Sequence, residues 1–157
     1  MSRLYGRSPR GERCLGGVPH GHWQTVTLVA ALRHDGLCAP WILDGPMNGC
    51  AFLTYIKKVL GPELTPGDIV ICDNLASHKV IGVGKAIEAM GASLLYLPAY
   101  SPDLNPIEMA FAKLKAALRA SAQRNFDGLL AATATAIASF SSDHCLNFFR
   151  HALYATD

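Results

Sequence analysis

Two short apolar runs constrain the fold of this chain more than any other feature. The first is Ile-Val-Ile-Cys at residues 69–72, and the second is Ser-Leu-Leu-Tyr-Leu-Pro at residues 93–98. A run without polar alternation is typical of a strand that is covered on both faces. Residues 80–91 between them have helical character and end at Gly91. We therefore predict a strand–helix–strand unit, which is almost always right-handed with parallel strands.

An antiparallel hairpin is predicted before this unit. Residues 23–32 are rich in Thr, Val and Leu, and residues 37–43 form a second apolar run. His-Asp-Gly at residues 34–36 lies between them and is a turn signal. Residues 48–60 then have apolar side chains at helical spacing and end before a Gly-Pro pair. A hairpin followed by alternating helices and strands indicates an α/β fold.

The two ends of the chain differ in character. Residues 1–22 are rich in arginine and broken by Gly and Pro, which predicts a loop or arm. Residues 105–157 are predicted to be largely helical, in three segments at 105–121, 126–141 and 143–155. Half of the 157 residues are hydrophobic and 17% are charged, which argues against disorder. We expect a single domain over residues 1–157.

The charge of the chain is nearly balanced, but its basic residues are clustered. The formal net charge of +2 is too small to indicate a partner. Four arginines lie in the first thirteen residues, and four basic residues between 110 and 126 have no acid among them. Such clusters are compatible with a phosphate-rich ligand, although solvated helix faces and loops explain them as well. No apolar stretch of membrane length occurs, and five cysteines without a Cys-x-x-Cys pair indicate free thiols.

A group of polar residues follows the first buried strand. Asp73 and Asn74 come directly after it, and His78 and Lys79 follow one turn later. The loop after the second strand leads to Glu108 on the first turn of a long helix. Ligand sites in open α/β sheets lie beyond the carboxyl ends of parallel strands. We therefore expect Asp73 and Glu108 to meet at one edge of the sheet.

Glu108 has an alternative structural explanation. Asn105 is placed as an N-cap and Pro106 as the first helical residue, so Glu108 in the third position completes a capping box. The rest of the helix favours a site, because its apolar and polar positions separate into two stripes. The predicted core-facing seam is Ile107, Phe111, Leu114 and Leu118, and the neighbouring stripe is Glu108, Ala112, Lys115 and Arg119.

An acid followed by bases along one helix face is compatible with a metal site beside a polyanion. Two Mg²⁺ or Mn²⁺ ions about 3.5–4 Å apart can bind the attacking and leaving oxygens of a phosphodiester. Carboxylate oxygens suit these hard cations and offset their charge. Asp73 and Glu108 alone provide few ligands for two such ions.

The sequence around these residues resembles a known family. "DNLASHK" and "GASLLYLPAYSPDLNPIEMAFAKLK" closely resemble the DDE transposases of the mariner superfamily, in its bacterial insertion-sequence branch. The 34 residues between Asp73 and Glu108 match the spacing that this branch uses between its second and third catalytic acids. The likeness extends through "RLYGRSPRGER", "HWQTVTLVAALRHDG" and "WILDGPMNG", so it covers most of the chain.

The resemblance implies a ribonuclease-H-like fold and a recombinase function. In this fold the hairpin, a central strand and the strand–helix–strand unit build one mixed sheet flanked by helices. The enzyme nicks DNA at element ends and joins the freed 3′-hydroxyl to target DNA. Asp73 and Glu108 correspond to the second and third acids and bind two Mg²⁺ or Mn²⁺ ions. Asn74 and His78 belong to the motif as auxiliary residues, with turn hydrogen bonding and surface solvation as their respective alternatives.

The sequence departs from the family pattern at its amino-terminal end. The first catalytic acid of the family precedes the arginine-rich segment, whereas no acid here precedes Glu12 and no strand precedes residues 23–32. Asp44 ends the second hairpin strand, which in the sheet order that the resemblance implies lies two places from the central strand, so strand spacing puts it roughly 10 Å from the required position. Asp44 and Asp103 are therefore interpreted as turn and loop residues. We expect a carboxy-terminal catalytic portion that lacks the central strand and the helix-turn-helix domain, and that is inactive alone.

These expectations identify the partners of the chain and an alternative to the catalytic function. The expected partners are DNA and a second copy or a full-length transposase, in the bacterial cytoplasm near the nucleoid and without a membrane. The candidate DNA contacts are Arg7, Arg10, Lys79, Lys115 and Arg119. The chain is interpreted as a truncated copy or the second product of a split reading frame. The alternative is a non-catalytic fragment that binds DNA or transposase and modulates transposition. A receiver-domain function for Asp73 is disfavoured because no acidic pair precedes it.

Overall fold

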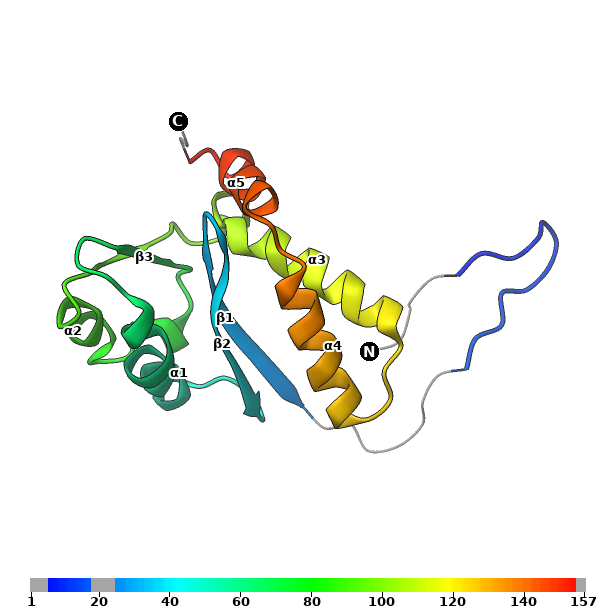
Figure 1. Cartoon of the computed structure of the whole chain (residues 1–157), viewed down its shortest axis with the longest axis horizontal. Coiled ribbons are helices and arrows are strands. Elements are labelled where there is room, and N and C mark those ends of the chain that lie inside the picture. Colours follow the sequence, from blue (N-terminus) through cyan, green and yellow to red (C-terminus); the bar gives the residue numbers. More distant parts are fainter. Residues whose placement is uncertain (1–5, 18–24, 155–157) are drawn as a thin grey trace.

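A computed structural model describes residues 6–17 and 25–154 of the chain. The rest of the predicted arm, the first two residues of the predicted strand 23–32 and the last three residues of the chain lie outside the described residues. In Figure 1 the β1–β2 hairpin stands between two groups of elements, with β3, α1 and α2 on one side and α3 and α4 on the other. Residues 6–17 form an exposed loop that extends away from both groups (Figure 1).

The predicted hairpin is confirmed. Strand β1 (Val26–Arg33) pairs antiparallel with β2 (Gly36–Asp44), and the turn between them is His34-Asp35. The register is irregular at Ala39, which has a positive φ of 49° and lets the second strand bend at a bulge.

The helix expected at residues 48–60 is also present, but its backbone geometry changes from α-helical to π-helical along its length. Helix α1 (Gly49–Tyr55) begins at Asn48, whose side chain accepts a hydrogen bond of 2.9 Å from the Ala51 N–H. It continues as the π-helical segment η1 (Ile56–Leu60) and ends in the short 3₁₀ segment η2 (Gly61–Glu63).

The strand–helix–strand unit is confirmed, with a shorter helix than the sequence predicts. Strands β3 (Ile69–Cys72) and β4 (Ser93–Tyr96) are parallel and paired over their full lengths. A 3₁₀ segment, η3 (Ala76–Lys79), precedes the helix, and α2 (Val83–Glu88) begins only after Gly82. Gly82 has a φ of 102°, a left-handed conformation that interrupts the helix predicted from residue 80.

Strand β3 is covered on one face rather than on both, so that prediction is wrong. Val70 and Cys72 pack toward the core between α1 and α2. The alternate residue Ile69 is 64% exposed, and Leu95 on the neighbouring strand β4 is 52% exposed. Helices cover only the face to which Val70 and Cys72 point, because successive side chains on a strand point to opposite faces.

The strands form two separate sheets within the described residues. Strands β1 and β2 make one two-stranded sheet, and β3 and β4 make the other. A cavity of about 410 Å³ lies between them, lined by residues 27–31 of β1 and residues 70–73 of β3 and its end. The one mixed sheet expected from the family resemblance is therefore divided into an antiparallel half and a parallel half.

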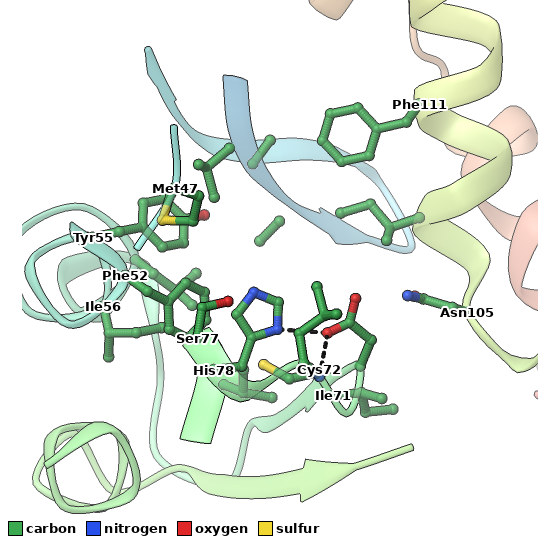
Figure 2. Close-up of a pocket in the computed structure, with 18 of the residues that line it drawn as sticks. Met47, Phe52, Tyr55, Ile56, Ile71, Cys72, Ser77, His78, Asn105 and Phe111 are labelled. Carbon is green, nitrogen blue, oxygen red and sulfur yellow. Dashed lines mark hydrogen bonds and ion pairs between the residues drawn. The ribbon is translucent and has the colours of Figure 1, made fainter. Parts of the chain in front are cut away.

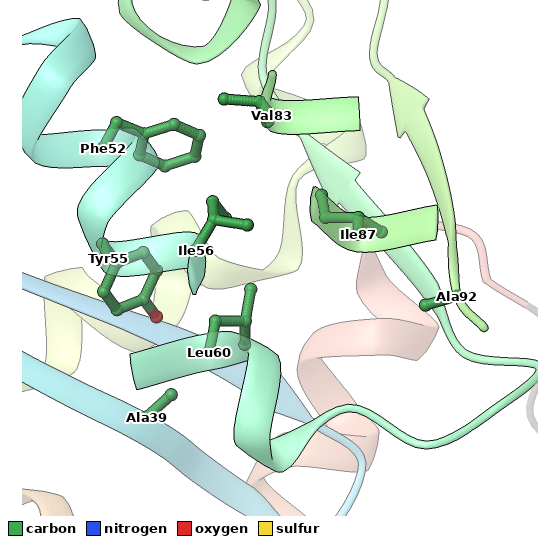
Figure 3. Close-up of a cluster of buried hydrophobic side chains, with 8 residues drawn as sticks. All are labelled: Ala39, Phe52, Tyr55, Ile56, Leu60, Val83, Ile87 and Ala92. Atoms are coloured by element: carbon green, nitrogen blue, oxygen red, sulfur yellow. The ribbon is translucent and has the colours of Figure 1, made fainter. Parts of the chain in front are cut away.

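Two hydrophobic cores pack against the strands, the first against both sheets and the second against the β1–β2 hairpin. The first core joins α1, η1 and α2, and its residues are Ala39, Phe52, Tyr55, Ile56, Leu60, Val83, Ile87 and Ala92 (Figure 3). The second core joins α3 (Pro106–Ser121), α4 (Phe126–Ala138) and α5 (Ser142–His151). Its buried residues are Ala110, Leu114, Leu118, Ala136, Phe140 and Cys145. Ile107 and Phe111 pack against it, so the predicted seam of α3 is confirmed.

Candidate metal and nucleic-acid site

Asp73 is positioned by the end of β3 and by two contacts to one of its oxygens. Its Oδ1 accepts a hydrogen bond of 3.2 Å from the Leu75 N–H and lies 2.6 Å from Nδ1 of His78 (dashed lines in Figure 2). No other described residue forms a hydrogen bond or ion pair with Oδ2. Asp73 is therefore a turn-forming residue through one oxygen and keeps the other available for a ligand.

His78 is packed into the site and is not a solvated surface residue, so that alternative is wrong. Its ring lies over the Phe52 ring of α1, with centroids 4.1 Å apart, and its side chain is 18% exposed. The Tyr96 hydroxyl donates a hydrogen bond of 2.8 Å to the His78 carbonyl. Figure 2 shows His78 beside Phe52 and Cys72, at the centre of the residues that line the cavity. His78 thus links the middle of α1 to the end of β3.

Asn74 presents a buried side-chain oxygen that has no hydrogen-bond partner among the described residues. The turn after β3 is closed by the Asp73 carboxylate and not by Asn74. The alternative of turn hydrogen bonding for the Asn74 oxygen is therefore wrong. An amide oxygen that is buried without a partner is costly unless a ligand or water satisfies it.

Glu108 lies on the first turn of α3 and does not form the predicted capping box. Asn105 is the N-cap and Pro106 the first helical residue, as expected, but the Asn105 side chain makes no capping hydrogen bond. The Glu108 N–H donates to the Asn105 carbonyl at 3.1 Å. The Glu108 side chain is exposed, and no residue of the described part of the chain forms a hydrogen bond or ion pair with it. Capping does not occupy this carboxylate.

Asp73 and Glu108 line the same two cavities. The larger cavity is the one between β1 and β3 (Figure 2), and the second, of about 360 Å³, is lined by residues 97–102 of the loop after β4. Asn105 also lines both, and Asn74 lines the second. The fold therefore places two carboxylates that are distant in the sequence on the lining of the same two cavities.

The donors gathered here are all oxygens. Carboxylates and an amide oxygen suit Mg²⁺ or Mn²⁺ better than a softer metal. Within residues 6–17 and 25–154, no three His, Cys, Asp or Glu side chains are grouped closely enough to hold a metal ion. Asp44, the last residue of β2, lines neither cavity, and Asp103 is exposed in the 3₁₀ segment η4 (Pro102–Leu104).

The candidate DNA contacts are divided among three places. Lys115 and Arg119 lie on the same stripe of α3 as Glu108, and Lys115 is exposed. Lys79 is exposed beside the site, with its Nζ 5.7 Å from the centroid of the Tyr96 ring. The loop containing Arg7 and Arg10 extends away from the site (Figure 1). The structure thus places Lys79 beside the site and Lys115 and Arg119 two and three turns along α3 from Glu108, and the arm lies away from the site.

Two residues of the larger cavity were not predicted from the sequence. Tyr55 is 2% exposed, burial raises the pKa of its hydroxyl, and that hydroxyl has no hydrogen-bond partner among the described residues. Burial, followed by the Asp73 charge, raises the pKa of the Cys72 thiol to about 12. Helical spacing places Tyr55 on the buried face of α1, but no sequence signal indicates that its hydroxyl lacks a partner.

The amino-acid sequence identifies the family to which the chain belongs. Residues 1–129 match the DDE superfamily endonuclease family. The chain belongs to this family. A search of curated proteins found no match. Among the described residues, no helix has the length and apolar character needed to cross a membrane.

Solved structures of the Mos1 mariner transposase have the same fold. The Mos1 strand transfer complex aligns with a TM-score of 0.74 and 17% identity, over 96% of this chain and 46% of that chain. The Mos1 catalytic domain aligns with a TM-score of 0.62 and 17% identity, over 81% of this chain and 74% of that chain. Its complex with Raltegravir and Mn aligns with a TM-score of 0.64 and 16% identity. The chain spans about half the length of the transposase in the strand transfer complex, and the ribonuclease-H-like fold class is confirmed.

Proposed function

We propose that this chain is the catalytic portion of a transposase that cleaves DNA strands and joins them to target DNA in a metal-dependent reaction. The observation that supports the proposal most directly is the convergence of Asp73 and Glu108 on the same cavities. Membership of the DDE endonuclease family and the Mos1-like fold support the reaction class. The structures of the Mos1 catalytic domain with Mn and with Mg support a divalent ion as cofactor.

The residues of this chain divide into metal ligands and residues that position them. Asp73 through Oδ2, Glu108 and the Asn74 oxygen are the proposed ligands, because none of these oxygens has a partner from the described residues. A bound Mg²⁺ or Mn²⁺ ion supplies charge stabilisation and activates the attacking oxygen. His78 holds the Asp73 carboxylate through Oδ1. Lys79 beside the site, and Lys115 and Arg119 on the Glu108 stripe of α3, are proposed to contact the DNA backbone.

We further propose that the chain by itself has little nicking activity. The described residues supply two carboxylates and one amide oxygen, whereas a two-ion phosphodiester site needs more anionic ligands to offset four positive charges. The same observation favours a second candidate function, in which the chain binds DNA or an intact transposase without catalysis. Both proposals place it on DNA, in a bacterial insertion sequence and near the nucleoid, as part of a dimer or a mixed assembly.

Manganese binding tests the ligand assignment without requiring activity. Titration calorimetry with Mn²⁺ should detect binding to the unmodified chain, and Asp73→Asn and Glu108→Gln should each weaken it at least tenfold. Asp103→Asn is the matched control, because Asp103 lines neither cavity. Equal affinity in all four proteins would refute the assignment.

A nicking assay separates the two candidate functions. Supercoiled plasmid with Mn²⁺ should remain intact with this chain alone, and should be nicked when an upstream segment carrying the family's first catalytic acid is fused to it. Robust nicking by the chain alone would contradict the claim of an incomplete site. Absence of nicking by the fused protein, together with retained DNA binding, would instead favour the non-catalytic function.

A further inference from the structure

We propose that Tyr154, which directly follows the end of α5, is a positioning residue that holds Glu108 at the candidate metal site. It acts through the backbone of Leu104, which lies four residues before Glu108 in the sequence. The inference rests on the proposed role of Glu108 as a metal ligand. Tyr154 lies beyond residues 1–129, the part of the chain that matches the endonuclease family, so the family match does not assign it a role.

One long-range hydrogen bond ties the segment before α3 to a distant part of the chain. The Tyr154 hydroxyl donates to the Leu104 carbonyl at 3.0 Å, across 50 residues of sequence. The other hydrogen bonds that residues 98–105 form within the described part of the chain are local. Burial raises the pKa of the Tyr154 hydroxyl, so the group stays protonated and can donate at neutral pH.

The turn at the end of α5 fixes the direction of the Tyr154 side chain. Leu153 has a positive φ of 65°, the left-handed conformation that ends a helix in a Schellman motif. Both hydrogen bonds of that motif are present. The Tyr154 N–H donates to the Phe149 carbonyl at 3.0 Å, and the Leu153 N–H donates to a carbonyl three residues earlier at 3.1 Å. The Phe149 and Tyr154 rings also meet edge to face, with centroids 5.8 Å apart.

The packing of Leu153 itself does not explain this turn. Leucine is unfavourable at a positive φ, where glycine is the usual residue. The Leu153 side chain is also 83% exposed, so it gains little from burial. Backbone strain of this kind persists where the surrounding contacts require it. The contact that the turn produces is that of Tyr154 with Leu104.

Helix α5 is a firm base for this contact because it is docked on α3. Cys145 of α5 is buried in the second hydrophobic core with Ala110 and Leu114 of α3, and Phe148 packs against that core. Ala152, the C-cap of α5, is also buried. In Figure 1 α5 lies beside the start of α3. The Tyr154 hydroxyl therefore connects the packed helices to the segment that leads into α3.

The first turn of α3 depends on such a contact because its own capping is incomplete. The Asn105 side chain makes no capping hydrogen bond, although Asn105 is the N-cap residue. A helix end that lacks a side-chain cap leaves backbone groups unsatisfied and frays. Tyr154 holds the carbonyl of the residue that precedes Asn105, so it restrains the first turn and, with it, Glu108. Residues that orient a metal ligand in this way change metal affinity without touching the metal.

Titration calorimetry of hydroxyl-deletion variants with Mn²⁺ tests the proposal. Tyr154→Phe keeps the aromatic ring and removes the hydroxyl, and it should weaken Mn²⁺ binding about fivefold. Ser121→Ala is the matched control, because it also removes a hydroxyl that donates to a backbone carbonyl, at 2.8 Å, but at the far end of α3. It should leave Mn²⁺ affinity unchanged. In a Glu108→Gln background, Tyr154→Phe should have no further effect, because it acts through Glu108.

Amide hydrogen exchange followed by NMR measures the positioning in the absence of a metal. Tyr154→Phe should speed exchange of the Asn105 and Glu108 amides about fivefold, because the segment before α3 loses its distant anchor. The amides of Leu114 and Leu118, farther along α3, should exchange at their original rates. Unchanged exchange at Asn105 and Glu108 would overturn the inference.

The two measurements separate this inference from the proposed function. If Glu108→Gln weakens Mn²⁺ binding but Tyr154→Phe does not, the inference is overturned and Tyr154 is a structural contact only. An equal loss of affinity in Ser121→Ala and Tyr154→Phe would also overturn it, since the effect would then be general destabilisation. If Glu108→Gln binds Mn²⁺ as tightly as the unmodified chain, the ligand assignment itself is refuted, and the inference with it.

Discussion

Replacing Asp68 with asparagine is expected to destabilise the chain in a pH-dependent way, because it removes the charged link between the two sheets. The Asp68 carboxylate receives two hydrogen bonds from Arg33, at 2.5 and 3.4 Å, and one of 2.9 Å from the Thr65 N–H. Arg33 also donates to the Glu63 carbonyl at 2.9 Å. The substitution retains an acceptor for Thr65 and removes the charge, so it isolates the ionic part of the link.

The magnitude follows from the pKa of Asp68. The Arg33 hydrogen bond, followed by that from the Thr65 N–H, lowers this pKa from 3.8 to about 2. At about 1.4 kcal/mol per pH unit, this shift corresponds to at most about 2.5 kcal/mol. The side chains of Arg33 and Asp68 are 35% and 23% exposed, so solvent screening reduces the contribution. We expect Asp68→Asn to lower the free energy of unfolding by about 1 kcal/mol at pH 7.

The pH dependence has a definite sign. A carboxylate with a lowered pKa in the folded state stabilises the fold above its unfolded pKa, near 4, and this contribution disappears as the pH falls toward 2. Urea unfolding followed by circular dichroism should therefore show a difference between the two proteins at pH 5 and 7. That difference should shrink through pH 4 to 2 and in 1 M salt.

Two comparisons make the test specific. Asp103→Asn should not change stability, because Asp103 is exposed and forms no ion pair between the sheets within the described residues. In an Arg33→Gln background, Asp68→Asn should cost less than half of its usual amount. A cost at pH 7 that persists unchanged at pH 2, or that is the same without Arg33, would refute the ionic explanation.

Two further predictions concern backbone conformation and thiol burial. Gly82→Ala should destabilise the chain by about 1 kcal/mol, because the φ of Gly82 is 102°. Gly84→Ala, inside α2, should stabilise the chain by about 0.5 kcal/mol. Thermal unfolding that gives both changes the same sign would contradict these predictions. At pH 8, iodoacetamide should modify the exposed Cys50 in the folded chain. It should modify Cys72, whose thiol has a pKa of about 12, and the buried Cys145 only after urea is added. Mass spectrometry of the digested chain measures this, and fast modification of Cys72 in the folded state would show that burial does not protect it.

Much of the fold and the shared location of the two candidate site residues could be predicted from local patterns. The apolar runs at 69–72 and 93–98 identify the parallel strands, and their spacing identifies the helix between them. Asp73 and Glu108 are predicted to converge because one follows a strand end and the other begins the next long helix. These features depend on the period of side chains along one element and on the handedness of its connection.

Other features could not be predicted because helical periodicity does not report backbone detail. The helix expected from residue 80 begins only after Gly82, since a glycine in a helical pattern does not reveal a positive φ. The unbroken apolar run of β3 predicts two covered faces, but Ile69 is exposed. Whether a strand is covered depends on which distant helices pack on it.

The sequence by itself determined the element types, the family motif and the two acids that line the same cavities. Only the tertiary structure decided that His78 lies between Phe52 and Asp73, and that a cavity separates β1 from β3. Only it showed that the Tyr55 hydroxyl is buried without a partner from the described residues. The physical reason is that local patterns record which face of an element is apolar, whereas these features depend on contacts between segments far apart in the chain.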